Sequence, residues 1–309
     1  MATEIDLPPF RVPVNADGSF LAFGQGTSGT VTRAVDTRPG GGAVALKSIP
    51  VTLREEDRDR VIQQLEALYT GQHPNVTGFL GATFYPPRSS ILIACEFMDL
   101  RSFKDVMSVC KAQDKGAGWI PEEVVGFVSG RVLDGLVYMH RERKQIHRDI
   151  KPSNILINSR GEVKICDFGM STQLQNTLDP ANTWVGSTTY MSPERISGLQ
   201  YIWNSDIWSL GISLVEIATG CFPYQQPGQQ LELVDLLDRI VDNEPPSLPE
   251  TFGADFRDFI ALTLVKRVEE RPHAEMLVGH PFVIRCQLAD LSEWLGSVTT
   301  ATSAAQATY

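Results

Sequence analysis

The chain has 309 residues, with 37 acidic and 27 basic side chains, a net charge of −10 and 42% hydrophobic residues. This length suits two domains or one large bilobal domain with a full hydrophobic core. The negative charge argues against a nucleic-acid-binding protein and against a protein that binds anionic membranes, because both need basic residues that face phosphate groups.

The cysteines narrow the class of protein further. There are five of them, far apart and never spaced C-x-x-C, so neither a disulfide framework nor a zinc ribbon is indicated. The first residues lack the basic and apolar regions of a secretory signal, and no run of 18 apolar residues occurs. We therefore expect a soluble protein in the reducing cytoplasm.

A strand-rich part comes first along the chain. We expect residues 1–17 to form a mobile N-terminal extension, because they contain prolines and show no hydrophobic periodicity. Residues 18–97 are mostly strand-like, and one helix from a capping box at Thr52 to about Tyr69 interrupts them. The strands are indicated by β-branched or apolar runs at 30–32, 43–46 and 90–94.

A helical part follows at residues 98–285. One helix opens at Pro121, and five of its residues have i, i+3 or i, i+4 spacing: Val124, Val128, Val132, Leu136 and Met139. Further helices are predicted at 205–219, 228–242 and 254–265. We expect residues 286–309 to form a C-terminal helix and a flexible tail, since the tract from Gly296 onward is rich in Ser, Thr and Ala.

A G-x-G-x-x-G-x-V loop occupies residues 24–31. Its glycines let backbone N–H groups approach phosphate oxygens. A dinucleotide-binding turn has a similar pattern, but it needs a following helix, whereas Thr30–Thr32 is β-branched and predicts a strand. Lys47 lies eighteen residues after Gly29 and can reach the α- and β-phosphates of a nucleotide.

The most informative motif is His147–Asn154, followed by Asp167-Phe168-Gly169. Asp149 can orient a substrate hydroxyl and accept its proton, and Lys151 can offset charge on a transferred phosphoryl group. Asn154 and Asp167 supply the oxygen ligands that Mg²⁺ prefers. A surface loop with solvated charges does not account for five spaced matches in this order.

With these motifs, residues 18–295 resemble a eukaryotic protein kinase. The segments at 164–169, 185–195, 205–211 and 289–295 resemble the MAP kinase kinase group. The resemblance implies an α+β, bilobal protein kinase fold, with a small antiparallel-sheet N-lobe that holds one helix and a larger, mainly helical C-lobe. It also implies an ATP- and Mg²⁺-dependent dual-specificity enzyme that phosphorylates Thr and Tyr in a MAP kinase activation loop.

The resemblance assigns roles by position. Glu96, Phe97 and Met98 become the adenine-binding hinge, and Cys95 the gatekeeper. Glu194 is expected to pair with Arg271, and Asp206 to hold the backbone of the catalytic loop. The residues expected to contact ATP are Gly24, Gln25, Gly26, Gly29, Val31, Ala45, Lys47, Cys95, Glu96, Met98, Leu156 and Cys166. Those expected in catalysis are Asp149, Lys151 and Lys47.

One position departs from the family pattern. Counting back from His73-Pro74-Asn75-Val76 places Gln64 where the family has a glutamate that pairs with the strand lysine. Glu66 is two residues further on, about 200° around the helix, and should face elsewhere. A neutral amide gives up the charge-assisted part of the interaction with Lys47, so we expect low basal activity.

Activation is expected to run through residues 170–192. Arg148 is the residue type that pairs with a phosphorylated loop, and the candidate acceptors are Thr177 and Thr183. The alternative is that one or both are ordinary solvated loop threonines. An upstream MAP kinase kinase kinase would phosphorylate them.

Two alternatives to an active MAP kinase kinase follow from the sequence. A pseudokinase scaffold is supported by Gln64 alone, and a Ser/Thr kinase outside the MAP kinase kinase group would differ in its substrate sites. The N-terminal stretch 1–14 contains one basic residue, Arg11, and lacks the basic docking cluster of many members of the group.

Two further features bear on partners. Leu288, Leu291, Trp294 and Leu295 have helical spacing, and this stripe either packs on the large lobe or serves an upstream kinase. Residues 231–260 hold eight acidic and two basic residues, which is more than half of the net charge. We expect this acidic region to steer a basic patch of the substrate kinase.

Overall fold

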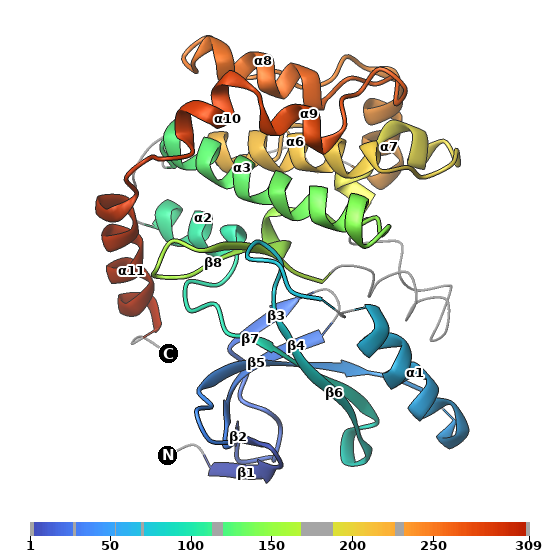
Figure 1. The fold of residues 1–309 in the computed structure, drawn as a ribbon, viewed down its shortest axis with the longest axis vertical. Coiled ribbons are helices and arrows are strands. Elements are labelled where there is room, and N and C mark those ends of the chain that lie inside the picture. Colours follow the sequence, from blue (N-terminus) through green and yellow to red (C-terminus); the bar gives the residue numbers. More distant parts are fainter. Residues whose placement is uncertain are drawn as a thin grey trace. The chain divides into compact units, whose positions relative to one another are not determined.

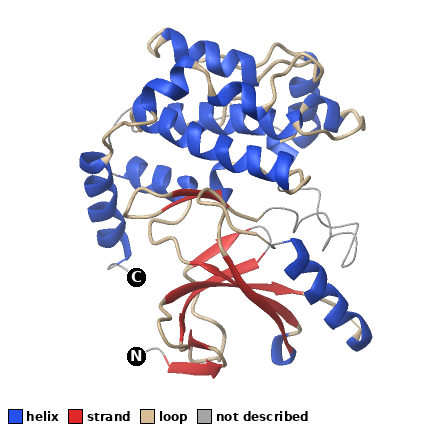
Figure 2. Ribbon diagram, in the orientation of Figure 1, coloured by secondary structure: helices blue, strands red, loops and turns tan. Residues whose placement is uncertain are grey.

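The computed structural model describes residues 3–26, 29–52, 54–68, 71–112, 120–167, 188–225 and 232–306. They form two compact units, which divide after Met98, with Pro74–Val76 belonging to the second unit. The first unit is built on an antiparallel sheet and the second mainly on helices (Figure 1, Figure 2). The predicted α+β class is confirmed.

The sheet of the first unit has the strand order β1-β2-β4-β5-β7-β6, and β3 pairs with the start of β4. Every neighbouring pair is antiparallel. The strands predicted at 30–32, 43–46 and 90–94 lie within β4, β5 and β7. The bounds are β1 Thr3–Leu7, β2 Phe10–Val14, β3 Gly24–Gly26, β4 Gly29–Asp36, β5 Ala43–Pro50, β6 Phe79–Tyr85 and β7 Ser90–Glu96.

The N-terminal hairpin corrects a prediction. Residues 3–14 are not an irregular extension but strands β1 and β2, and β2 adds to the sheet beside β4. Val12 and Val14 are buried together with Phe20 and the sheet residues Leu46 and Leu92. The hairpin therefore covers one face of the sheet. Its alternating valines are too few, and too interrupted by prolines, to stand out in the sequence.

Helix α1 (Glu55–Leu68) packs beside β6 in the first unit. Its inward side chains are Val61 and Leu65, both nearly inaccessible to solvent. The guanidinium of Arg58 lies 4.1 Å from the centre of the Phe84 ring in β6, a distance at which the cation and the ring attract each other. The predicted helix is confirmed between residues 55 and 68.

The second unit is mainly helical, with a small sheet of two antiparallel strands. Its α-helices are α2 Phe103–Ala112, α3 Glu122–Val137, α5 Pro193–Ile196, α6 Asn204–Thr219, α7 Leu233–Asp242, α8 Ala254–Thr263, α9 Ala274–Val278, α10 Pro281–Cys286 and α11 Ser292–Gln306. The small strands are β8 Ile155–Ile157 and β9 Val163–Ile165. Short helical turns are η1 Pro86–Arg88 in the first unit, and η2 Tyr138–Glu142, η3 Pro152–Asn154 and η4 Thr188–Tyr190 in the second.

The core of the second unit lies between α3, α6, α8 and α10 (Figure 1). The predicted apolar stripe of α3, from Val124 to Met139, is buried as expected. A Cβ on Gly126 would lie 2.4 Å from the Cys286 sulfur, so α3 and α10 approach closely only because this residue is glycine. The predicted helices at 205–219 and 254–265 correspond to α6 and α8. The predicted start of a helix at 228 lies outside the described residues.

The C-terminal helix corrects a second prediction. Residues 292–306 form α11, so the Ser/Thr/Ala tract is helical up to Gln306 and not an irregular tail. The Trp294 ring stacks on Phe103 of α2, with centroids 6.4 Å apart, and Leu291, Val298 and Ala301 are buried. Leu291 and Trp294 of the predicted apolar stripe therefore pack on the second unit, whereas Leu288 is 97% exposed and does not. Within the described part of the chain, no helix combines the length and apolarity needed to cross a bilayer.

Candidate active site

The first unit places most of its predicted nucleotide-binding residues on one face of the sheet. Val31 is opposite Lys47, and Ala45 is opposite Cys95. Opposed residues in an antiparallel pair point to the same side, so these four side chains share a face. Val31, Ala45 and Cys95 are half-buried and Lys47 is 7% exposed. The opposite face carries the closed core of Leu46 and Ala94.

The glycine loop is flanked by two paired strands. Gly24 pairs with Val31 and Gly26 with Gly29, so β3 and β4 are antiparallel neighbours. A Cβ on Gly29 would lie 2.2 Å from the carbonyl oxygen of Ser48, and the φ of Gly29 is 141°. Only glycine fits there. Because a strand follows Gly29, the dinucleotide-binding alternative is wrong. Gln25 pairs with Thr30, while residues 27 and 28 at the tip lie outside the described residues.

The end of β7 carries the segment expected to bind adenine. The Glu96 N–H donates to the Gly78 carbonyl at 2.8 Å, and the Glu96 carboxylate accepts from the Gly78 N–H at 3.2 Å. Met98 is 3% exposed, and the Phe97 ring lies 5.1 Å from that of Phe23. These contacts hold the segment against its own unit.

In the second unit, the segment predicted to be catalytic is held around one carboxylate oxygen of Asp149. Asp149 Oδ2 lies 2.8 Å from Lys151 Nζ and 2.9 Å from Asn154 Nδ2, and the same amide donates to the Asp149 carbonyl at 2.7 Å. The Asp149 and Lys151 side chains are 13% and 7% exposed. A carboxylate fixed in this way can orient a hydroxyl group and accept its proton.

Asp206, at the start of α6, anchors the backbone that precedes Asp149. Its carboxylate accepts the backbone N–H groups of His147 and Arg148, each at 2.8 Å. It also binds His140 Nε2 at 2.8 Å and accepts from the Tyr201 hydroxyl at 3.1 Å. Burial would raise the pKa of Asp206, but the hydrogen bond and charge of His140 keep it below its usual value. The expected role of Asp206 is therefore seen.

His147 links the segment that carries Asp149 to the segment that carries Asp167. Its Nε2 lies 2.9 Å from the Cys166 carbonyl oxygen, and its Nδ1 accepts the Asp149 N–H at 3.3 Å. This pattern fits a neutral ring with the proton on Nε2, and complete burial lowers the pKa of His147. Arg148 and Asp167 both adopt positive φ, 72° and 63°, so the backbone is strained on both sides of this contact.

The magnesium ligands can be tested against the geometry. Asn154 uses its amide nitrogen to bind Asp149, which leaves its carbonyl oxygen as the acceptor end. Asp167 follows Cys166, and the Cys166 backbone N–H donates to the Asn154 backbone carbonyl at 3.0 Å. The two candidate ligands therefore lie on segments joined by a hydrogen bond. One amide oxygen and one carboxylate suit Mg²⁺, which takes few protein ligands when it also binds phosphates. The residues fit this ion.

A second buried ion pair supports the site from α5. Glu194 binds Arg271 through two contacts, at 3.0 and 3.1 Å, and both side chains are almost completely buried. Ser205 also donates to Glu194 at 2.7 Å. Burial would raise the pKa of Glu194, but the guanidinium of Arg271 lowers it below its usual range. The expected pair is confirmed.

The other predicted residues fall in two groups. Leu156 in β8 and Cys166 after β9 are half-buried in the second unit. Thr177, Thr183, Phe168 and Gly169 lie outside the described residues. Sequence reasoning missed His140 and Tyr201, which bind Asp206, and Arg195, which donates to the Arg148 carbonyl at 2.9 Å. Asp206 lies 66 positions after His140, and Arg195 lies 47 positions after Arg148, so no spacing rule along the chain identifies these contacts.

Comparison with known proteins supports the same assignment. Residues 20–283 match the family described as protein kinase domain. The chain is 36% identical to the Dual specificity mitogen-activated protein kinase kinase 1 of Dictyostelium discoideum, over 89% of this chain and 54% of that protein. It is 42% identical to the Mitogen-activated protein kinase kinase 2 of Arabidopsis thaliana, over 84% of this chain and 70% of that protein. It thus spans about half the length of the first relative.

Proposed function

This chain belongs to the protein kinase family, in the MAP kinase kinase group, and from that premise we propose its reaction. It transfers the γ-phosphoryl group of ATP to Thr and Tyr in the activation loop of a MAP kinase. The observation that carries the proposal is the Asp149 carboxylate, held by Lys151 and Asn154. ATP with Mg²⁺ supplies the phosphoryl group and neutralises its charge.

The residues of this chain do the positioning. Asp149 directs the acceptor hydroxyl and takes its proton, while Lys151 offers positive charge beside the same oxygen. Asp206 keeps the two N–H groups before Asp149 fixed, so the carboxylate does not have to reorganise during the reaction. Lys47, on the half-open face of the first sheet, binds nucleotide phosphates, and Val31, Ala45 and Cys95 give the adenine an apolar surface.

Replacing the carboxylate tests this function. Asp149→Asn keeps the size of the side chain and one acceptor oxygen but cannot accept a proton, so phosphorylation of a kinase-inactive MAP kinase should fall by about 10²- to 10⁴-fold. Asp99→Asn, an aspartate whose carboxylate binds the Ser159 N–H, is the matched control and should keep normal turnover. ATP binding should persist in both variants. Absence of turnover in the unmodified, phosphorylated protein would favour a scaffold.

Mapping the sites on the substrate separates the remaining alternative. Phosphate on both Thr and Tyr of the activation loop is expected for dual specificity, and phosphate on Ser or Thr elsewhere would indicate a kinase outside the group. We further propose that a MAP kinase kinase kinase activates this protein at Thr177 and Thr183. Phosphopeptide mapping after treatment with such a kinase should find both sites, and no phosphate at either would contradict the proposal.

A further inference from the structure

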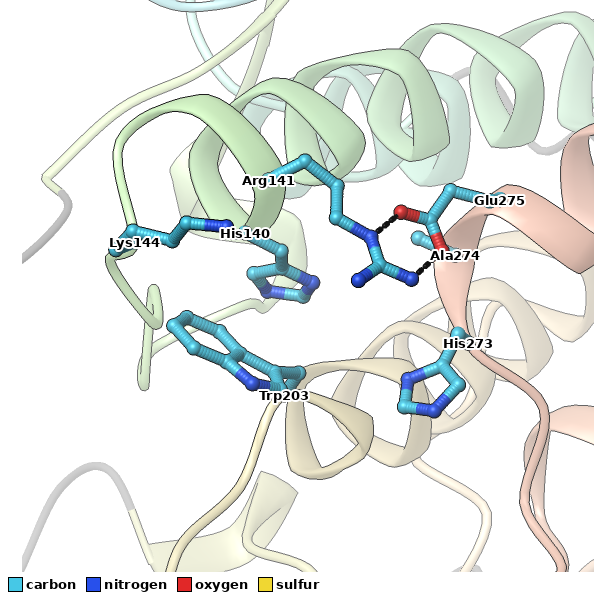
Figure 3. A pocket seen from close by; sticks show the side chains of 7 residues that line it. All are labelled: His140, Arg141, Lys144, Trp203, His273, Ala274 and Glu275. Carbon is cyan, nitrogen blue, oxygen red and sulfur yellow. Dashed lines mark hydrogen bonds and ion pairs between the residues drawn. The ribbon is translucent and has the colours of Figure 1, made fainter.

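A small pocket lies on the second unit, at the ends of three segments that meet around it (Figure 3). His140 and Arg141 come from η2 and Lys144 from the loop that follows it. Trp203 precedes α6. The remaining lining residues, at the start of α9, are His273, Ala274 and Glu275. None of these residues takes part in the catalytic mechanism proposed above, although His140 binds Asp206.

The lining is strongly basic. Four of its seven residues carry a basic side chain, and Glu275 is the one acid. Arg141 already binds Glu275 through two contacts, one of them at 2.7 Å. This pair neutralises itself, so Lys144 carries the remaining fixed positive charge of the lining, and the two imidazole rings add nitrogens that can form hydrogen bonds. Such a lining favours an anion and disfavours a cation or an apolar group.

The size and shape of the pocket select a class of anion. Its cavity volume is about 60 Å³, which admits a few water-sized groups and no nucleotide or drug-sized molecule. A carboxylate binds best to a planar guanidinium fork, but Glu275 occupies the fork of Arg141. His140 and Lys144 lie four positions apart on one segment, and His273 comes from a second segment at the start of α9 (Figure 3). Donors in several directions suit a tetrahedral oxyanion, which carries about −1.5 to −2 charge as a phosphoryl group.

We propose that this pocket binds a phosphoryl oxyanion, either as free phosphate or as a phosphorylated side chain. Lys144 and His273 are its outer ligands, and both are exposed. His140 is the inner ligand, 7% exposed and in contact with the Trp203 ring, with centroids 5.3 Å apart. Because His140 also lies 2.8 Å from Asp206 Oδ2, an anion beside it strengthens the same hydrogen bond that serves the catalytic loop.

The test follows the imidazole signals of His140 and His273 by NMR in the full-length protein, with the nucleotide site filled by ADP. The probes are inorganic phosphate, N-acetyl-phosphoserine amide and acetate. We expect both signals to shift with saturation at low-millimolar phosphate or phosphoserine amide, and acetate to bind much more weakly. Tighter binding of the phosphoserine amide identifies a phosphorylated protein segment as the source. Equal binding identifies free phosphate.

Three variants define the site. Lys144→Ala and His273→Ala should each weaken phosphate binding by about tenfold, because each removes one hydrogen-bonding group from the lining. Glu275→Gln removes the carboxylate that competes with phosphate for Arg141, and it should tighten phosphate binding. Lys111→Ala, an exposed base at the end of α2 that does not line the pocket, is the control and should change nothing. Acetate binding as tight as phosphate, or unchanged affinity in both alanine variants, would overturn the proposal.

Discussion

Gln64 lies on α1 with an exposed side chain, at the position where the family pattern has a glutamate. Lys47, its expected partner on β5, is 7% exposed. Among the residues that the structure describes, no hydrogen bond joins the two side chains. Helix α1 packs on the first unit through Val61, Leu65 and the Arg58–Phe84 contact. An ion pair with Lys47 would add to this packing.

We predict that Gln64→Glu raises the turnover of the purified, phosphorylated protein. A carboxylate within reach of Lys47 forms a charge-assisted bond, and about 1 kcal/mol of added stabilisation of the active arrangement corresponds to roughly fivefold in rate. Gln63→Glu places the same charge on the neighbouring, exposed position of α1 and should leave turnover unchanged. Steady-state kinetics on a MAP kinase substrate check this. Equal turnover in wild type and Gln64→Glu would refute it.

Among the elements, the N-terminal hairpin is the one that the sequence did not predict. It extends the sheet beside β4 and brings Val12 and Val14 into a core with Phe20, Leu46 and Leu92. Val12 has no exposed surface at all. The hairpin thus closes the face of the sheet that lies opposite the half-exposed Val31, Ala45 and Cys95. Its contribution to function is indirect, through the stability of the first unit.

We predict that Val12→Ala destabilises the first unit by about 2 kcal/mol, because it removes two buried methyl groups and leaves a gap. Val35→Ala is the matched control, since Val35 lies in β4 with 46% of its surface exposed and should cost well under about 1 kcal/mol. Urea unfolding followed by hydrogen exchange of β2 and β4 amides measures the difference. The two variants should not unfold at the same urea concentration if the hairpin is part of the core.

At the scale of the whole molecule, buried titratable groups make stability depend on pH. Complete burial lowers the pKa of His147 below its ordinary value of 6.5. Just below pH 6.5 the imidazole is therefore protonated in the unfolded chain but still neutral in the folded chain. The stability that neutral His147 contributes is fully present above about pH 6.5 and falls as the pH drops below it. The pKa values of Asp206 and Glu194 are also lowered, and these carboxylates titrate only at more acidic pH.

We predict that the free energy of unfolding falls between pH 6.5 and pH 5, and that His147→Gln removes most of this dependence. The amide of glutamine can still donate to the Cys166 carbonyl but does not titrate in this range. Urea unfolding at several pH values measures the slope in both proteins. A slope as steep in His147→Gln as in wild type would show that other groups cause the acid sensitivity.

The acidic region of residues 232–260 concerns the charge of the whole molecule. Asp235 and Asp238 are exposed on α7 and can attract a basic patch of the substrate kinase over several ångströms. We predict that Asp235→Lys with Asp238→Lys slows phosphorylation of a MAP kinase, with the largest effect at low salt. Glu269→Lys with Glu270→Lys gives the same charge change at exposed positions outside this region and should have a smaller effect. Rates that do not depend on salt would rule out steering.

Much of the architecture and the catalytic motif could be predicted from local patterns. The apolar stripe of α3 and the strands β4, β5 and β7 all follow from periodicity, which backbone geometry imposes on nearby residues. The structure of the two ends of the chain could not be predicted in this way. Residues 3–14 and 296–306 contain prolines or small polar residues, and their strands and helix form because distant surfaces bury Val12, Val14, Val298 and Ala301.

Residue type and spacing were enough to propose Asp149, Lys151, Asn154 and Asp167 as the residues that carry the chemistry, because both are local properties of the chain. Only the tertiary structure decided how Asp149 is held. Asp206 binds the backbone N–H of His147 from 59 positions further along the chain, and His140 and Tyr201 in turn bind Asp206. Buried carboxylates need several donors at once, and only folding brings those donors together.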